Sequence, residues 1–336
     1  MAESHFQRVG ILGAGSWGTA LATVLAERGL QVRLWGHDPA QIRQLQATRL
    51  NQEYLPGVPL SENISFSQEL SDLADSDFLL FVVPSAAMRE VAAQAKSIGL
   101  RPGVPLVSCT KGIELETGER MTEVMGDELP GHPLAVLSGP SHAEEVGKRL
   151  PTAVVVGSED AATATSLQEV FTLPWFRSYT SEDVRGIEYG GAIKNVFAIA
   201  AGACEGLRLG DNSKAGLVTR GLAEMVRLGT CLGGKPQTFY GLSGMGDLVV
   251  TCYSAHSRNA QVGLQLGQGQ AVEEVLKGMK MVAEGVPNTR SIHRLVQQMG
   301  AACPIIEVVY QVIYEQKSSG KALHDLLSRD PKAEVE

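Results

Sequence analysis

One lysine stands alone in a stretch that is otherwise apolar or rich in small residues. Lys194 is the one charged residue between positions 190 and 202. In a helix it would share one side with Gly190, Gly191, Ala198 and Gly202, which predicts open space around its ammonium group. A buried, unpaired ammonium costs on the order of several kcal/mol, so an anion, a carboxylate or a lowered pKa must compensate. A lysine of lowered pKa can exchange protons with a substrate near neutral pH, whereas a structural lysine would extend to the surface or bridge an acid.

A second group of residues could bind phosphate. Gly13-Ala14-Gly15-Ser16-Trp17-Gly18 has the spacing GxGxxG, directly after an apolar run and at the start of a helical pattern. In such a turn Gly13 permits the tight bend, Gly15 lets the backbone approach a pyrophosphate, and Gly18 lets helix and strand pack closely. The N-terminus of the following helix offers unpaired N–H groups to the phosphates. The sequence therefore predicts a dinucleotide site, the alternative being a turn that only connects two elements.

The residues after the next predicted strand would contact the adenosine ribose, and there the sequence reads Gly36-His37-Asp38. An acid at this point favours the free 2′-hydroxyl of NAD, whereas a cation accommodates the 2′-phosphate of NADP. Asp38 precedes Pro39 and could instead cap the next helix, and His37 is neutral or weakly cationic near pH 7. The choice between NADH and NADPH therefore stays open.

An acid and two further cations could hold an anionic substrate. Asp247 lies in the glycine-rich segment 241–251, and Ser257-Arg258-Asn259 precedes a helical pattern. The Arg258 guanidinium offers a planar fork for a phosphate or carboxylate, although both segments could be simple helix starts. Lys111 follows a predicted strand, and ligands bind at the carboxyl ends of such strands.

Two kinds of architecture must position these residues. In the first half, short apolar runs alternate with helical patterns, which predicts an α/β, Rossmann-like, doubly wound and mostly parallel sheet. The expected strands are 9–12, 31–35, 78–83, 105–109, 134–138 and 153–156, with a first helix over 17–28. From about residue 183 to 328 the pattern is helical. We therefore expect a dinucleotide-binding domain over residues 1–183 and an all-α substrate and catalytic domain over residues 184–336.

Composition excludes several classes of function. The chain has 336 residues, 20% of them charged, and a formal net charge of −8, without a basic block for nucleic acid or a membrane surface. No apolar run approaches the roughly 20 residues that a membrane span requires, and no signal peptide is evident. Five scattered cysteines show neither a disulfide framework nor metal-ligand spacing. These observations predict a cytoplasmic protein that binds no metal.

Several motifs together resemble one enzyme family along nearly the whole chain. The matching stretches are GAGSWGTALA (13–22), TKG (110–112), LSGPSHAEEV (137–146), GGAIKNVFAIAAG (190–202), LGDNSKAGLVTRG (209–221), GLSGMGDLVVTC (241–252), SRN (257–259) and VAEGV (282–286). On these motifs the sequence resembles the bacterial-type NAD(P)-dependent glycerol-3-phosphate dehydrogenases. The resemblance implies reversible reduction of dihydroxyacetone phosphate to sn-glycerol 3-phosphate, a phospholipid precursor, with NADPH or NADH as cofactor and a homodimer as the assembly.

The resemblance also implies roles for individual residues. Lys194 matches the acid/base that protonates the C2 oxygen, and Asp247 matches a substrate-site residue expected to orient it. The other positions that match substrate contacts are Lys111, Gly139, Ser141, Ser257, Arg258 and Asn259, while Asn195 and Thr251 are expected to line the pocket. The positions that match cofactor contacts or belong to the phosphate turn are Gly13, Gly15, Ser16, Trp17, Gly18, His37, Lys111, Ala143, Arg258, Val282 and Glu284.

Two other classes of function are compatible with a lysine-bearing helix that follows a dinucleotide fold. A β-hydroxyacid or 6-phosphogluconate-type dehydrogenase has the same order of elements, but the GMGDL and SRN stretches argue against it. A non-catalytic NAD(P)H-sensing module is expected to lack the acid/base lysine or the substrate cations, all of which this sequence retains.

Overall fold

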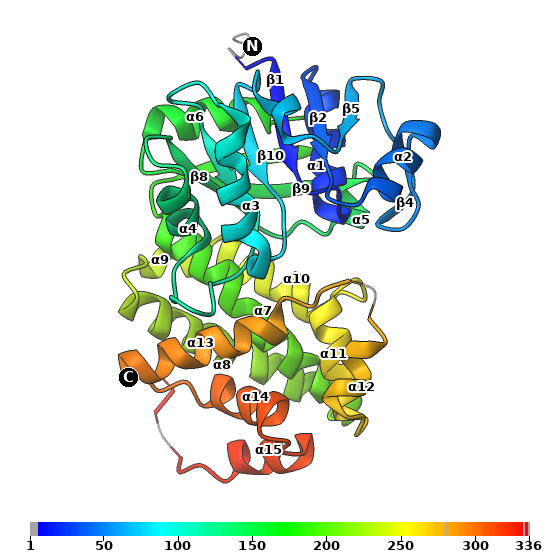
Figure 1. Cartoon of the computed structure of the whole chain (residues 1–336). Coiled ribbons are helices and arrows are strands. Elements are labelled where there is room, and N and C mark those ends of the chain that lie inside the picture. Colours follow the sequence, from blue (N-terminus) through cyan, green and yellow to red (C-terminus); the bar gives the residue numbers. More distant parts are fainter. Residues whose placement is uncertain (1–5, 280, 332, 335–336) are drawn as a thin grey trace.

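The chain forms two units that differ in architecture (Figure 1). The structure, a computed structural model, describes residues 6–279, 281–331 and 333–334. A sheet flanked by helices, the sheet unit, ends with β10 (Phe176–Ser181), and an assembly of helices, the helical unit, begins with α7 (Val184–Gly206). The Asp183 carboxylate caps α7 by accepting a hydrogen bond from the backbone N–H of Gly186 at 3.0 Å. A domain division between residues 183 and 184 stays a prediction.

The sheet has eight strands in the order β10-β9-β8-β7-β6-β1-β2-β5. Neighbouring strands are parallel, with the exception of the antiparallel pair β8 and β9. Besides β10, they are β1 (Arg8–Leu12), β2 (Gln31–Trp35), β5 (Ile64–Ser67), β6 (Phe78–Phe81), β7 (Leu106–Ser108), β8 (Leu134–Ser138) and β9 (Thr152–Gly157). A separate two-stranded sheet pairs β3 (Leu50–Asn51) with β4 (Leu55–Pro59).

Helices cover both faces of this sheet, which confirms the predicted doubly wound fold. On one face Ile11 and Leu80 pack in one apolar cluster with Leu25 of α1, and on the other Phe81 packs with Met88 of α3. The covering helices are α1 (Ser16–Glu27), α2 (Pro39–Thr48), α3 (Met88–Ala95), α4 (Met121–Glu128), α5 (Ala143–Val146) and α6 (Ala161–Val170), with 3-10 turns η1 (Leu70–Leu73), η2 (Ser85–Ala87) and η3 (Lys96–Ile98). Because both faces are covered, the central strands are continuous apolar runs, as parallel strands usually are.

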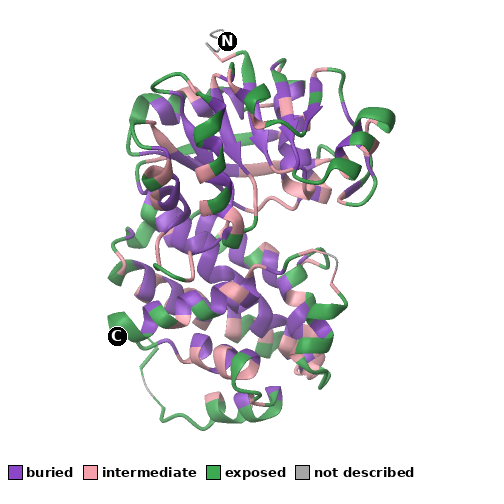
Figure 2. Cartoon of the chain, viewed as in Figure 1, coloured by how far each residue is buried: buried purple, intermediate pink, exposed green. Residues whose placement is uncertain are grey.

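In the helical unit, α7 is the central element, and every residue from Gly186 to Gly202 is buried (Figure 2). The surrounding helices are α8 (Asp211–Cys231), α9 (Pro236–Phe239), α10 (Asp247–Tyr253), α11 (Arg258–Gly267), α12 (Val272–Lys277), α13 (Gly285–Met299), α14 (Pro304–Tyr314) and α15 (Ser319–Leu327), with a π-helical turn η4 (Leu242–Gly246) before α10. Among the described helices, none combines the length and apolar composition needed to cross a membrane.

The small residues of α7 pack against backbone, and the open space predicted along this side is absent. A Cβ atom at Gly202 would lie 1.9 Å from the Ala260 carbonyl oxygen of α11, and one at Gly263 of α11 would lie 1.9 Å from the Ile199 carbonyl oxygen of α7. On the same side, a Cβ atom at Gly190 would lie 2.9 Å from the Ser243 carbonyl oxygen. The glycines therefore let α7 and α11 approach until their backbones touch, with Lys194 enclosed by the neighbouring elements.

Gly263→Ala is expected to lower the free energy of unfolding by about 2–3 kcal/mol, because the new methyl group overpacks a backbone contact. Gly216→Ala is the matched control. Gly216 is an exposed residue of α8, and a Cβ atom there would meet no atom within 4 Å. The control should keep or gain stability by about 0.5–1 kcal/mol, since alanine favours helix. Urea denaturation of both variants checks this, and equal stability of the two would contradict the proposed backbone contact.

Candidate active site

Two lysines and one carboxylate meet where the two units join. Lys111 follows β7 of the sheet unit, Lys194 lies in the middle of α7, and Asp247 begins α10. The Asp247 carboxylate accepts from the Lys111 ammonium at 2.6 Å through Oδ2 and from the Lys194 ammonium at 3.1 Å through Oδ1. The side chain of Asp247 is only 2% exposed, so this carboxylate is a buried link between the two cations.

Thr251 completes the surroundings of the Lys194 ammonium group. It lies one helical turn after Asp247 in α10, and its Oγ1 accepts a hydrogen bond from Lys194 Nζ at 2.6 Å. The same hydroxyl donates to the Asp247 carbonyl oxygen, also at 2.6 Å. An ammonium group has three N–H donors. Among the described residues, Asp247 and Thr251 take two of those of Lys194, so one donor is left for a bound molecule.

The sequence left open whether the neighbouring cations or Asp247 have the larger effect on the pKa of Lys194. In the structure the pKa is lower than that of an ordinary lysine. Burial lowers the pKa of Lys194 from 10.5 to about 8, with Asp247 opposing the shift and Lys111 adding to it. Burial also acts to raise the pKa of Asp247, but the two ammonium groups outweigh it and hold that pKa below its ordinary value. The site therefore combines an ionised carboxylate with a lysine that can lose its proton near neutral pH.

Asparagines from the helical unit hold the main chain at Lys111. The Lys111 carbonyl oxygen accepts hydrogen bonds from the Asn288 amide at 2.9 Å and from the Asn195 amide at 3.4 Å. The side-chain oxygen of Asn195 in turn accepts a hydrogen bond from the Asn259 amide at 2.9 Å. The side-chain oxygen of Asn259 accepts from the Gly285 backbone N–H. Asn195 and Asn259, predicted as pocket and substrate residues, thus join this buried network. Asn288 is a residue that the sequence analysis missed, because no motif marks it.

The predicted substrate residues Ser257, Gly139 and Ser141 have mainly backbone partners. Ser257 caps α11 by accepting from the Ala260 N–H at 3.2 Å. The Gly139 carbonyl oxygen accepts from Lys111 Nζ and from the Ser141 hydroxyl, each at 3.0 Å. These contacts place the loop after β8 next to the Lys111 ammonium.

Arg258 differs from the other predicted substrate residues because its side chain is exposed. Its guanidinium donates one hydrogen bond to the Val282 carbonyl oxygen at 2.7 Å. A guanidinium has five N–H donors, so others remain for a bound anion. The predicted cofactor position Val282 thus contacts Arg258 through its backbone.

The glycine turn has the geometry that a dinucleotide requires. Gly13 has φ +123°, and a Cβ atom there would lie 2.2 Å from the Val82 carbonyl oxygen. A Cβ atom at Gly18 would lie 1.9 Å from the Gly13 carbonyl oxygen, whereas one at Gly15 would meet nothing within 4 Å. Within the described part of the chain, no side chain caps the N-terminus of α1. The space at Gly15 and the uncapped helix start fit the phosphates of NAD(P), which these residues would hold.

The ribose end and the support of this turn combine predicted and unpredicted residues. Asp38 caps α2 by accepting from the Ala40 N–H at 2.8 Å, and His37 is exposed beside it. Asn51 and Gln41 both donate to the Ala14 carbonyl oxygen, at 2.9 and 2.7 Å, and so anchor the turn. Neither anchor is evident in the sequence, because each contacts a residue more than 25 positions away.

The remaining cofactor positions lie at contacts between the units. The Glu284 carboxylate accepts from the Ser85 backbone N–H at 3.0 Å and from the Ser85 hydroxyl at 2.6 Å. Ser16 at the glycine turn contacts the Met281 sulfur at 3.4 Å. Ala143 begins α5 and is buried, while the Trp17 indole N–H is buried without a partner among the described residues. The segment before α13 therefore reaches across to the glycine turn, and the sequence analysis missed both Ser85 and Met281.

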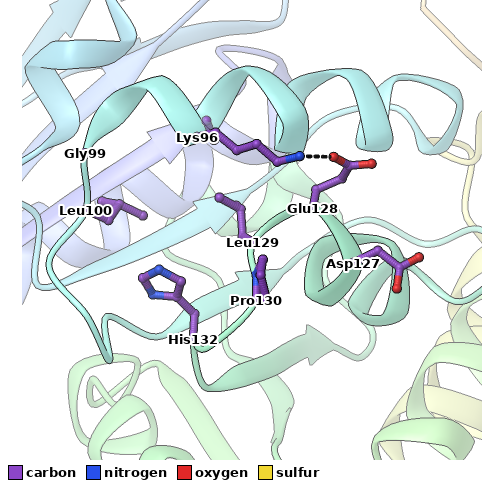
Figure 3. Close-up of a pocket in the computed structure, with 9 residues that line it drawn as sticks. Lys96, Gly99, Leu100, Asp127, Glu128, Leu129, Pro130 and His132 are labelled. Carbon is purple, nitrogen blue, oxygen red and sulfur yellow. Dashed lines mark hydrogen bonds and ion pairs between the residues drawn. The ribbon is translucent and has the colours of Figure 1, made fainter.

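A hollow elsewhere on the sheet unit has no such chemistry (Figure 3). It lies between η3 and the end of α4 and is lined by Lys96, Asp127, Leu129 and neighbouring residues. Its charged groups are paired with each other or with nearby side chains, as Lys96 is with Glu128 at 2.6 Å and Asp127 with Arg89 at 3.6 Å. None of the predicted site residues lines it.

A doubly wound sheet with a glycine turn, joined to a helical unit that carries a buried lysine of lowered pKa, is the arrangement expected of NAD(P)-dependent dehydrogenases. Comparison with known proteins narrows this class. The family model described as NAD-dependent glycerol-3-phosphate dehydrogenase N-terminus matches residues 8–164, and the corresponding C-terminus model matches residues 183–324. The chain belongs to the NAD-dependent glycerol-3-phosphate dehydrogenase family, and it is an oxidoreductase that uses NADH or NADPH.

Individual relatives agree with this assignment. The chain is 50% identical over 332 residues to glycerol-3-phosphate dehydrogenase [NAD(P)+] of Geobacter metallireducens, which covers 98% of this chain and 99% of the relative. It is 46% identical over 332 residues to the enzyme of the same name from Chlorobium phaeobacteroides, with the same two coverages. The crystal structure of glycerol-3-phosphate dehydrogenase from Coxiella burnetii superimposes with a TM-score of 0.93 at 39% identity, covering 96% of this chain and 99% of that one. Family membership thus decides against the two alternative classes.

Proposed function

We propose that the protein catalyses the reversible NAD(P)H-dependent reduction of dihydroxyacetone phosphate to sn-glycerol 3-phosphate, which supplies phospholipid synthesis. The observation that carries the proposal is the Lys194 ammonium, buried 3.1 Å from Asp247 with its pKa lowered to about 8. A ketone that becomes an alkoxide needs a proton donor at its oxygen, and this amine can both give and regain a proton near neutral pH.

In the proposed mechanism, bound NAD(P)H supplies the hydride that the substrate carbon receives. Lys194 donates to the substrate carbonyl oxygen through the N–H that Asp247 and Thr251 leave free, and it transfers its proton as negative charge develops there. Asp247 and Thr251 hold the amine in place during this transfer. Lys111, bound to the other oxygen of Asp247, adds positive charge at the same point. In the reverse reaction, neutral Lys194 accepts the proton of the alcohol.

The proposed function is tested by following NAD(P)H absorbance with dihydroxyacetone phosphate and, in parallel, with β-hydroxyacid substrates and 6-phosphogluconate in the oxidative direction. NADH and NADPH are compared on one protein sample, because exposed His37 and helix-capping Asp38 leave the preference open. We expect oxidation that depends on the triose phosphate. Its absence would refute the proposed substrate.

Arg258→Ala is expected to raise the KM for dihydroxyacetone phosphate about tenfold or more, because a charge-assisted contact to the phosphate is lost. Arg227→Ala is a matched control, since the Arg227 guanidinium also donates to a backbone carbonyl oxygen at 2.7 Å, that of Ala302. Steady-state kinetics should show a normal KM for the control. A KM that Arg258→Ala leaves unchanged would contradict phosphate binding by Arg258.

Three further expectations remain part of this proposal. All five cysteines are free thiols, which supports a reducing compartment, and we place the protein in the cytoplasm. The assembly implied by the family resemblance is a homodimer. The acidic net charge of −8 argues against nucleic acid as a partner, and a small phosphorylated substrate would be held by the few placed cations Lys111, Lys194 and Arg258.

A further inference from the structure

Buried polar atoms without a partner occur at the glycine turn and in the loop after β8. Among the described residues, four buried side-chain nitrogen or oxygen atoms lack a hydrogen-bond partner: Trp17 Nε1, Asn51 Oδ1, Ser138 Oγ and His142 Nε2. Trp17 belongs to the glycine turn, and Asn51 anchors that turn. Ser138 ends β8, where its Oγ would lie 3.2 Å from a Cβ atom at Gly191 in α7. Because buried polar groups are normally paired, each of these atoms is a candidate for a partner supplied by a bound molecule.

His142 is the member of this set that faces the substrate side of the site. It lies in the loop between β8 and α5, three residues after the Gly139 carbonyl that accepts from Lys111. Its ring centroid is 5.9 Å from that of His256, which lies two residues before Arg258 on the helical unit. In the same loop, Pro140 would lie 3.6 Å from a Cβ atom at Gly246, the neighbour of Asp247. His142 is therefore close to His256, which precedes α11, and belongs to the loop that contacts the Lys111 ammonium.

The charges around His142 determine which ligand group it could meet. Burial lowers the pKa of the imidazole, and Lys194 and Lys111 lower it further, against the opposing effects of Asp247 and Glu144. The two ammonium groups draw an anionic substrate into the same space. A neutral imidazole still has one N–H donor. The two lysine ammonium groups cannot accept a hydrogen bond from it, whereas an oxygen of the substrate can.

We propose that His142 is a further substrate-binding residue whose Nε2 forms a hydrogen bond with an oxygen of the phosphorylated substrate. The inference rests on the proposed function, because that function names the substrate. The arriving anion also favours a protonated imidazole, so the affinity for substrate gains a pH dependence that originates at His142. The groups that face the ring and shape this dependence are Lys194, Lys111, Asp247, Glu144 and His256.

Three substitutions separate hydrogen bonding from shape and from charge. His142→Phe keeps an aromatic ring without nitrogen, His142→Gln places an amide near the position of Nε2 without titrating, and His142→Asn is too short to reach that position. We expect His142→Phe and His142→Asn to raise the KM for dihydroxyacetone phosphate about tenfold or more, as loss of a hydrogen bond to a charged group does. His142→Gln should stay within about threefold of the unmodified protein.

The pH dependence of KM supplies the readout that a structural role would not move. Ionisation of the substrate phosphate affects all variants alike, so the difference in log KM between the unmodified protein and His142→Gln isolates the imidazole. We expect that difference to change between about pH 5 and 7.5, a range that extends from below the ordinary histidine pKa to above it. The Kd for NADH, measured by fluorescence titration, should be the same in all four proteins.

Each result decides the inference. A normal KM in His142→Phe, a flat difference in log KM, or a loss confined to NADH binding would overturn it. If His142→Phe does not fold, the contrast between His142→Asn and His142→Gln decides in its place. Absence of turnover by the unmodified protein would refute the proposed function and this inference together, whereas normal turnover with unaltered variants would refute the inference alone.

Discussion

Lys194→Met should lower kcat for reduction of dihydroxyacetone phosphate at least about a hundredfold, and by as much as about ten-thousandfold, because it removes the ammonium group that contacts both Thr251 and Asp247 Oδ1, while Lys111 is bound to the other carboxylate oxygen, Oδ2. Methionine fills the volume of the lysine stem, and Asp247 keeps its partner Lys111 at 2.6 Å, so the fold should tolerate the change. Stopped-flow and steady-state measurements of NAD(P)H absorbance give kcat directly.

The control for this experiment is Lys214→Met. Lys214 also pairs with a carboxylate at 3.1 Å, that of Glu205, and its side chain is 13% exposed, but it lies on α8, where its ammonium group faces the Tyr253 ring and not the Asp247 carboxylate. It should retain the unmodified kcat. Turnover near that of the unmodified protein in Lys194→Met would remove Lys194 from the mechanism.

The pH profile of the unmodified protein gives the same residue a second signature. Ketone reduction needs protonated Lys194, so its kcat should fall as the pH rises through about 8, whereas alcohol oxidation needs the neutral amine and should rise there. Bound substrate and cofactor shift the pH at which both limbs occur. The kcat for reduction should still fall with pH, and the kcat for oxidation should still rise.

Asp247→Asn is expected to have the second large effect, on both activity and stability. The substitution removes the charge that raises the pKa of Lys194, so that pKa should fall further below its ordinary value and the limb for reduction should move to lower pH. It also leaves two partly or fully buried ammonium groups without their counter-charge, which costs on the order of 3 kcal/mol. Kinetics across pH and urea denaturation measure the two effects separately.

Asp75→Asn provides the matched comparison. Asp75 also pairs with two cations, Arg8 at 2.6 Å and Arg33 at 3.2 Å, but its side chain is 50% exposed. Exposed ion pairs contribute at most about 1 kcal/mol, so this variant should be nearly as stable as the unmodified protein and equally active. An equal loss of unfolding free energy in both variants would show that burial does not strengthen the ion pairs of Asp247 with Lys111 and Lys194.

Much of the fold could be predicted because the central strands have a simple pattern. The strand predicted over residues 78–83 is the buried β6, and its apolar run follows directly from coverage on both faces. The edge strands β5 and β10 were missed, because they alternate buried residues with exposed or polar ones such as Ser65 and Arg177. Half-covered strands carry a weaker apolar signal than central ones.

The candidate site could be predicted in its parts but not in its assembly. Lys194, Asp247 and Lys111 were each singled out by their local setting, yet their meeting depends on three elements from both units. Local patterns do not encode such contacts. Asn288 and Ser85 were missed for the same reason, because each is a lone polar residue whose partners are distant in sequence. The open side expected for α7 was wrong because small residues signal close approach of another helix as readily as free space.

The backbone contact between α7 and α11 also bears on which sugar phosphates the protein can accept. Lys194 belongs to α7 and Arg258 is the first residue of α11, and the glycine contacts allow neither helix to slide along the other. The separation between the backbone positions of Lys194 and Arg258 is therefore fixed. Under the proposed function the substrate spans these two side chains, so we expect sugar phosphates that are one carbon shorter or longer to be poorer substrates. On that proposal, the contact between the two helices would set the chain length that the protein selects, although neither Gly202 nor Gly263 is among the proposed substrate residues.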